Sequence, residues 1–403
     1  MRLLRIDQPT LHLRRDREGH FFIAGIPLSG GEGDSDVSDW IFGLRRVRIH
    51  NATLIWEDEQ RQAPVLRLES LNFALDNFGR THRFGLTARP PTEFASPIDV
   101  RGDFRGSDID SRGDWSGNAF AEIDEIDLAV WRQWIDYPFA LPHGRGALRA
   151  WIGVADGALR EMTLDLSLVD ANLRLARHLP SLDLARLSGR IAASFSEKGF
   201  VVNGRQVALE TRSEPRAKGE ASEAIRIEPT DFHAEWQPGK GDEDVPGKAS
   251  ASHLDLSALA RLAERLPLDA HTRRLLGDYA PRGRIADLNV RWRGNGERLE
   301  TYALKARFED LALRAQGYFP GFSGMSGAIE ANEKAGSANL LAQHSSLDLP
   351  SVFPVSLIEL DSLSARAQWK IDENGLEAGL SRVEFRGPEA AGAAKVEIGE
   401  DVE

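Results

Sequence analysis

The chain has 403 residues, of which 41% are hydrophobic and 28% are charged, proportions typical of a folded protein rather than a disordered one. Its formal net charge of −12 argues against non-specific nucleic-acid binding, which needs a basic surface. Because the sequence contains no cysteine, disulfides, thiolate nucleophiles and cysteine metal sites are all excluded.

Alternation of apolar and charged residues is the dominant pattern along the chain. It is clear in residues 83–89, and it recurs in residues 99–105, 164–168 and 367–371. Each such strand has one apolar and one charged face, which is typical of an antiparallel sheet with one side in water. We therefore expect a mainly β fold, an elongated and curved antiparallel β-sheet groove with a few short helices.

Helical spacing replaces this alternation in a few places. Apolar residues recur every three positions over 128–134, and one apolar stripe covers 256–266 with Asp255 placed to cap it. A third short helix is expected over 272–279, ended by Pro281. We expect the first two helices to plug an open edge or end of the sheet.

Internal repeats indicate stacked modules. Residues 5–11 match residues 48–54 at a shift of 43, and residues 168–174 match residues 308–314 at a shift of 140. Before each stretch of the second pair there is a predicted short helix followed by a Pro-x-Gly-Arg turn, at 142–145 and at 281–284.

These repeats predict three segments. An N-terminal β-rich segment covers 1–125, a first repeat unit covers 126–253, and a second repeat unit covers 254–403 and is truncated at its C-terminal end.

No uncharged apolar run approaches the roughly 18–20 residues of a membrane helix. Both ends of the chain read as strands, so we expect a piece of a longer protein.

The apolar strand faces pose a physical question, because such a face must be covered, close on itself or hold something apolar. A tandem array of strands can curl into an apolar trough that suits acyl chains, each buried CH₂ contributing about 0.8 kcal/mol. The alternative is a dry core of interdigitated side chains, and the residues alone favour that alternative.

Five stretches occur in an order that bears on this choice: residues 131–138, 182–190, 260–267, 320–327 and 348–350. In this order they resemble the AsmA-like superfamily, and specifically its YhdP family. The resemblance implies a periplasmic protein of Gram-negative bacteria, anchored by an N-terminal inner-membrane helix. It also implies a β-groove that conducts phospholipid toward the outer membrane and supports the permeability barrier there.

The chain departs from that family pattern because it lacks the membrane helix and the large C-terminal half. We therefore expect it to be the part of the bridge nearer the inner membrane. The resemblance implies phospholipid acyl chains as the ligand. Through the missing parts it implies an inner-membrane anchor and outer-membrane components as partners. It implies no catalytic residues, no cofactor and no nucleic acid.

The candidate groove-lining residues are apolar strand positions. Their alternation supports shared faces but does not say which face looks into the trough. They are Leu66, Leu68, Phe73, Leu75, Phe84, Leu86, Leu164, Leu166, Leu168, Leu173, Leu175, Phe308, Leu313, Trp369, Ile371 and Phe385.

No pattern in the sequence predicts an enzyme or a metal site. The ten histidines show none of the zinc-binding spacings. Residues 108–114 resemble the start of a calcium loop, but Arg112 occupies a ligand position, which favours a hairpin tip. Residues 321–327 contain no nucleophile-elbow motif. The acidic cluster at 57–59 is expected to be a solvated hairpin end.

Three functional hypotheses follow. The first is passive lipid transport, with acyl chains in the groove and head groups in water. The second is a non-transporting structural or assembly scaffold with a dry interior, which recruits a partner by strand addition. The third is a polysaccharide-binding or hydrolysing β-solenoid, which the dispersed tryptophans disfavour.

Overall fold

The computed structural model describes the chain in twelve stretches: residues 3–27, 43–107, 112–137, 139–197, 199–213, 223–237, 243–295, 299–317, 319–350, 356–372, 375–388 and 391–399. It divides into two compact units. The first comprises residues 1–196 with 209–212, and the second comprises residues 197–208 with 213–403. The three predicted segments have other bounds and stay a prediction. The predicted hairpin tip at 108–114 lies outside the described residues over 108–111.

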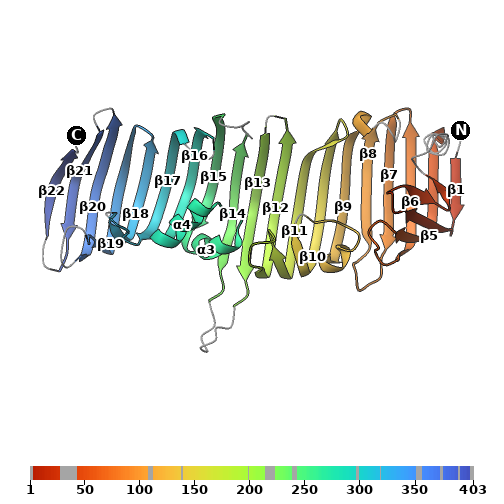
Figure 1. The fold of residues 1–403 in the computed structure, drawn as a ribbon, viewed down its shortest axis with the longest axis horizontal. Helices are drawn as coiled ribbons and strands as arrows, with labels where there is room; N and C mark the ends of the chain where they lie inside the picture. The colour runs from red at the N-terminus through yellow and green to blue at the C-terminus, as the bar shows by residue number, and fades with distance from the viewer. Residues whose placement is uncertain are drawn as a thin grey trace. The chain divides into compact units, whose positions relative to one another are not determined.

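The first unit is a sheet whose strands mostly pair with their neighbours in the chain (Figure 1). Its strands are β1 (Leu3–Asp7), β2 (Thr10–Arg15), β3 (Phe21–Ile23), β4 (Ile26–Pro27), β5 (Arg46–Asp58), β6 (Leu66–Phe78), β7 (Thr81–Arg89), β8 (Ile98–Arg105), β9 (Ser116–Asp127), β10 (Ala140–Ala155), β11 (Ala158–Arg174) and β12 (Leu182–Ser196). A 3₁₀ turn, η1 (Arg112–Asp114), precedes β9, and one short helix, α2 (Leu128–Trp131), follows it.

The second unit follows the same plan. Its strands are β14 (Arg226–Trp236), β15 (Val245–Asp255), β16 (Arg282–Gly294), β17 (Leu299–Leu313), β18 (Gly321–Asn332), β19 (Ala335–Asp348), β20 (Leu357–Asp372), β21 (Gly375–Arg386) and β22 (Ala391–Gly399), with β13 (Gly199–Thr211) divided between the units. The helices α3 (Leu256–Leu262), η2 (Ala263–Arg265) and α4 (Ala270–Tyr279) all lie between β15 and β16. The predicted class, mainly β and antiparallel with a few short helices, is confirmed.

The three predicted helices all form, although α2 is shorter than its pattern suggested. Aspartate caps begin all three, and the sequence predicts the one at Asp255. The Asp269 carboxylate at the start of α4 accepts a hydrogen bond from the main-chain N–H of Thr272. The Asp127 carboxylate accepts hydrogen bonds from the main-chain N–H groups of Ala129 and Val130, and Asp255 accepts one from Ala258. None of the helices in the described part of the chain is long and apolar enough to cross a membrane.

The repeat at a shift of 43 is a pair of neighbouring parallel strands. Arg5 lies opposite Arg48 and Leu11 lies opposite Leu54, so each residue of β1 and β2 pairs with its repeat partner in β5. Gln8 and Asn51 occupy matching places in the two copies, and both have positive φ angles, 55° and 49°. The repeat therefore encodes a shared backbone kink as well as a shared apolar pattern.

Strand bulges with positive φ recur in both units. Asp170 and Asp310, which are equivalent in the repeat at a shift of 140, have φ angles of 55° and 50°. His344 in β19 and Arg382 in β21 have φ angles of 53°. Register shifts accompany Asp310, His344 and Arg382. Each extra residue reverses the side-chain alternation, so apolar residues on both sides of a bulge reach the same face of the sheet.

Candidate functional site

An apolar groove runs across the face of the second unit, with a cavity volume of about 780 Å³. It is lined by 22 residues from β15 to β21 and α3, all with apolar side chains. They are Leu254, Leu256, Ile285, Leu288, Leu304, Ala306, Phe308, Leu311, Phe322, Met325, Ile329, Ala338, Leu340, Leu347, Ile358, Leu360, Leu363, Ala365, Trp369, Leu380, Val383 and Phe385.

The strand bulges explain how so many apolar side chains reach one face. Phe308 and Leu311 both line the groove although they are three positions apart in β17, and Asp310 between them supplies the reversal. In β19 the same relation joins Leu340 to Leu347 across His344. Without these bulges half of each strand would turn its apolar residues to the charged face.

Some side chains that line the groove are buried in its floor, and others are only half-buried. Phe308, Met325 and Ala342 form a buried cluster, against which Leu340 and Leu363 pack while remaining half-buried. Phe308 is only 6% exposed, so it contributes to the stability of the sheet as well as to the lining. The half-buried leucines are the side chains that a bound apolar molecule would meet.

The helices of the second unit differ in how firmly they attach. Leu262 and Ala263 are buried and fix α3 and η2 to the protein, and Leu256 of α3 contributes to the groove. By contrast, α4 has no buried residue, and its Leu275 is exposed. The plug predicted for the helix over 256–266 concerns α3 and η2 and stays a prediction.

In the first unit the corresponding apolar face is covered. A buried cluster of Leu66, Leu68 and Ala88 packs against Trp131 of α2, which is 8% exposed. The indole N–H of Trp131 donates to the Phe94 carbonyl at 3.2 Å, and that of Trp134 donates to the Pro64 carbonyl at 3.0 Å. The tryptophans therefore cover the apolar face of the sheet, with their polar edges satisfied, where the sequence predicted a plug at an open edge or end.

The predicted lining residues fall into three groups: those in or near the groove, those in the core of the first unit, and those in or just after β11. Phe308, Trp369 and Phe385 line the groove, Leu313 lies opposite Phe322 at its border, and Ile371 is 44% exposed beyond it. The six candidates from β6 and β7 belong to two core clusters or pack against them: Leu66, Leu68, Phe73, Leu75, Phe84 and Leu86. Five others are half-buried in or just after β11: Leu164, Leu166, Leu168, Leu173 and Leu175.

Most of the groove lining was absent from the sequence-based selection. Leu304, Leu340 and Leu363 all line it. Their strands show the same alternation as the strands that were selected, so the pattern alone could have found them. What it could not show is which of the many apolar faces stays open.

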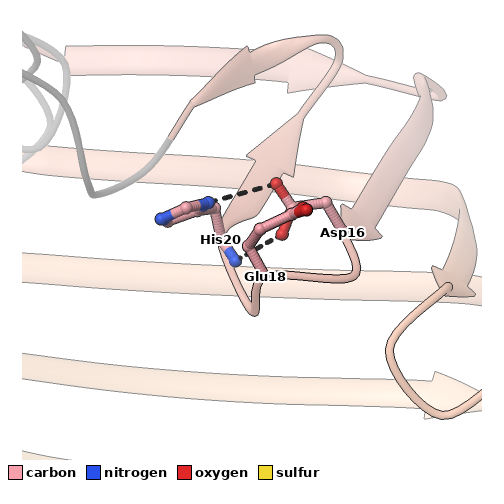
Figure 2. Close-up of side chains that lie close together, drawn as sticks. All are labelled: Asp16, Glu18 and His20. Atoms are coloured by element: carbon pink, nitrogen blue, oxygen red, sulfur yellow. Dashed lines mark hydrogen bonds and ion pairs between the residues drawn. The ribbon is translucent and has the colours of Figure 1, made fainter.

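A small group of possible metal ligands lies at the turn between β2 and β3. Figure 2 shows Asp16, Glu18 and His20, whose ligand atoms lie within 4.8 Å of one another. The Asp16 carboxylate already accepts the His20 main-chain N–H at 2.8 Å and lies 3.2 Å from its ring Nδ1. Desolvation acts to raise the pKa of Asp16, but these hydrogen bonds outweigh it and lower the pKa. The group is explained as a hydrogen-bonded turn.

The acidic cluster at 57–59 is not simply a solvated hairpin end, and that expectation was wrong for Asp58. Asp58 is 3% exposed and forms ion pairs with Arg15 and Arg61. Arg61 in turn pairs with Asp136, which follows α2. The network ties the β2–β5 pair to the segment that covers the first unit, so its role is structural.

Comparison with known proteins supports one assignment. The family model described as YhdP protein matches residues 1–400. No curated protein matches, and no solved structure matches. Since the match covers nearly the whole chain, the protein belongs to the YhdP family.

Proposed function

We propose that the second unit carries phospholipid acyl chains in its apolar groove. We also propose that the chain is the periplasmic part of a bridge that moves phospholipid between the inner and outer membranes. The observation that supports this most strongly is the chemistry of the lining, in which 22 side chains from β15 to β21 and α3 are all apolar. Membership of the YhdP family agrees with this role.

The lining suits a ligand of variable length without reactive groups. None of its side chains can ionise or donate a hydrogen bond except the indole of Trp369. Acid–base or nucleophilic chemistry has no group to act with among these lining residues, which supports binding as the role of this groove. Apolar contact contributes about 25 cal/mol for each Å² buried whatever the head group, which favours passive sliding over tight selection.

The proposed periplasmic location follows from the proposed role in lipid transport. A groove that accepts acyl chains from one membrane and releases them to another lies in the space between the two. The inner-membrane anchor and outer-membrane components belong to this proposal as its partners.

The first unit favours a second role for part of the chain. Its apolar face is filled by Trp131 and its neighbours, as a dry structural scaffold requires. The scaffold hypothesis therefore describes the region around β5–β9, and the transport hypothesis describes β15–β21.

Native mass spectrometry with lipid extraction tests the proposal, using two matched variants on one strand. Leu340→Asp places a carboxylate in the groove, whereas Leu341→Asp places it on the opposite face, where Leu341 is 59% exposed. We expect phospholipid to copurify with the wild type and with Leu341→Asp but not with Leu340→Asp. Wild-type protein that carries no lipid when purified with lipid present would contradict the proposal, and circular dichroism reports whether each variant folds.

A further inference from the structure

Aromatic side chains border one long side of the groove, near the hairpin connections of β14–β17. In the strand register Trp236 lies opposite Gly247, Gly247 lies opposite Trp292, and Trp292 lies opposite Tyr302. These residues alternate in phase with Leu288 and Leu304, which line the groove, so they share its face. Three aromatic rings thus lie at one level across four strands.

Trp369 continues this border on β20. It lies opposite Gly336, and a Cβ atom added to that glycine would come within 2.1 Å of the indole Cζ2. The Trp292 ring lies against Gly247 in the same way, with Cζ2 2.3 Å from such an atom. The two glycines leave room for the indoles to lie flat over the neighbouring strand, so both indoles stay at this border of the groove.

The polar edges of these rings are free, in contrast to those of the first unit. Among the described residues, no protein group accepts a hydrogen bond from the Trp292 indole, the Trp369 indole or the Tyr302 hydroxyl. In the first unit Trp131, Trp134 and Tyr137 all donate to main-chain carbonyls. Half-buried tryptophan and tyrosine with a free donor are typical of boundaries between apolar and wet surroundings.

The opposite side of the groove is lined by apolar side chains. There Phe322 and Leu347 lie opposite each other in the register and both line the groove, whereas Asp348, the next residue, alternates to the other face of the sheet. The aromatic side therefore offers N–H and O–H donors to a phosphate or ester oxygen, and the side of Phe322 and Leu347 offers apolar contact. The two sides of the groove are therefore chemically different.

We infer that phospholipid head groups leave the groove along the aromatic side, where Trp292, Tyr302 and Trp369 donate hydrogen bonds to the ester or phosphate oxygens. The acyl chains then extend over the floor toward Phe322 and Leu347. This inference rests on the proposed function and adds an orientation to it. It makes the three aromatic residues positioning groups for the lipid.

Site-specific fluorescence quenching tests the orientation. Because the chain has no cysteine, single cysteines can be introduced and labelled with bimane, at Val290→Cys beside the aromatic side and at Leu347→Cys on the opposite side. Each labelled protein is incubated with phosphatidylcholine that carries a nitroxide either on its head group or midway along one acyl chain. Circular dichroism of each labelled protein reports whether the fold is retained.

We expect the head-group nitroxide to quench the Val290→Cys label at least about twofold more than the Leu347→Cys label, while the chain nitroxide quenches both. Adding Trp369→Phe, which keeps a ring but removes the N–H, should lower head-group quenching at Val290→Cys by about twofold or more. Equal or reversed head-group quenching would overturn the orientation. If neither nitroxide quenches either label, the groove holds no lipid and the proposed function itself fails.

Discussion

The main-chain N–H of Asp310 donates a hydrogen bond to the hydroxyl of Ser326, on the neighbouring strand, at 3.1 Å. The same device recurs elsewhere: the N–H of Gln206 donates to the Asp231 carboxylate at 2.7 Å, and that of Asn51 donates to the Asn72 side chain at 3.1 Å. Asp310, Gln206 and Asn51 all have positive φ. A bulge removes one ladder hydrogen bond, and the neighbouring side chain replaces it. The bulges that keep the apolar faces continuous are thus fixed by specific cross-strand contacts.

Substitution at Asp310 should show that its backbone conformation matters more than its charge. Asp310→Val should lower the free energy of unfolding by about 1–2 kcal/mol, because a β-branched residue disfavours a positive φ. Asp310→Gly should be neutral or stabilising. Urea unfolding measures both, with Glu309→Val as the control on an adjacent exposed position. Equal midpoints for Asp310→Val and Glu309→Val would contradict the role assigned to the bulge.

Gly336 should tolerate no side chain. In Gly336→Ala the new methyl group would overlap the Trp369 ring, which must then move, at a cost of about 1–3 kcal/mol. Thermal unfolding and the tryptophan emission maximum report the change. Gly277→Ala in α4 is the matched control, because nothing lies within 4 Å of its added Cβ. That variant should be stabilised by about 0.5–1 kcal/mol, and the interpretation fails if both substitutions behave alike.

Removing the tryptophan that covers the first unit should expose its core. Trp131→Ala should destabilise the protein by about 3–5 kcal/mol, since it leaves a large cavity over Leu66 and Leu68. Trp131→Phe retains most of the ring and loses only the hydrogen bond to Phe94, so about 1 kcal/mol is expected. Differential scanning calorimetry measures both variants. A small effect of Trp131→Ala would mean that this face is open, like that of the second unit.

The ion pair of Asp165 and Arg190 should make a pH-dependent contribution to stability. The Arg190 guanidinium donates to the Asp165 carboxylate at 2.6 Å, and this hydrogen bond holds the pKa of Asp165 below its ordinary value. Since the folded pKa is the lower one, the contribution is present above the unfolded pKa of about 3.9. It is lost as the pH falls through the folded value.

A double-mutant cycle of Asp165→Asn and Arg190→Gln isolates this contribution. Both side chains are partly exposed, so the coupling energy at pH 7 should be at most about 1 kcal/mol. It should approach zero in acid, below the folded pKa of Asp165. A coupling energy that stays constant across this pH range would show that the carboxylate does not titrate with the pair.

The sequence predicts the strands well because each strand carries its own signal. The alternation of Phe84 and Leu86 with charged residues, the Asp255 cap and the two repeats all depend on neighbours in the chain. The repeat at a shift of 140 includes the position of a strand bulge, because Asp170 and Asp310 are equivalent residues in it. The meaning of that aspartate was not visible, because aspartate adopts a positive φ more often than most residues but the majority of aspartates do not.

Which apolar face stays open could not be predicted in the same way. Phe73 and Phe308 have the same kind of alternating surroundings, yet Phe73 packs against a covered core and Phe308 lines a groove. The difference depends on Trp131 and Trp134, which lie more than fifty residues beyond Phe73 in the chain and dock by tertiary packing. Local pattern carries no information about such distant contacts.

The most direct test of the central claim is photo-crosslinking with a phospholipid that carries a diazirine within one acyl chain. The labelled peptides of the whole chain are then mapped by mass spectrometry. The account predicts crosslinks in β17–β21, at half-buried lining residues such as Leu340 and Leu363, and none in β5–β8, where Trp131 covers the face. Crosslinks spread evenly over both regions, or confined to β5–β8, would contradict it.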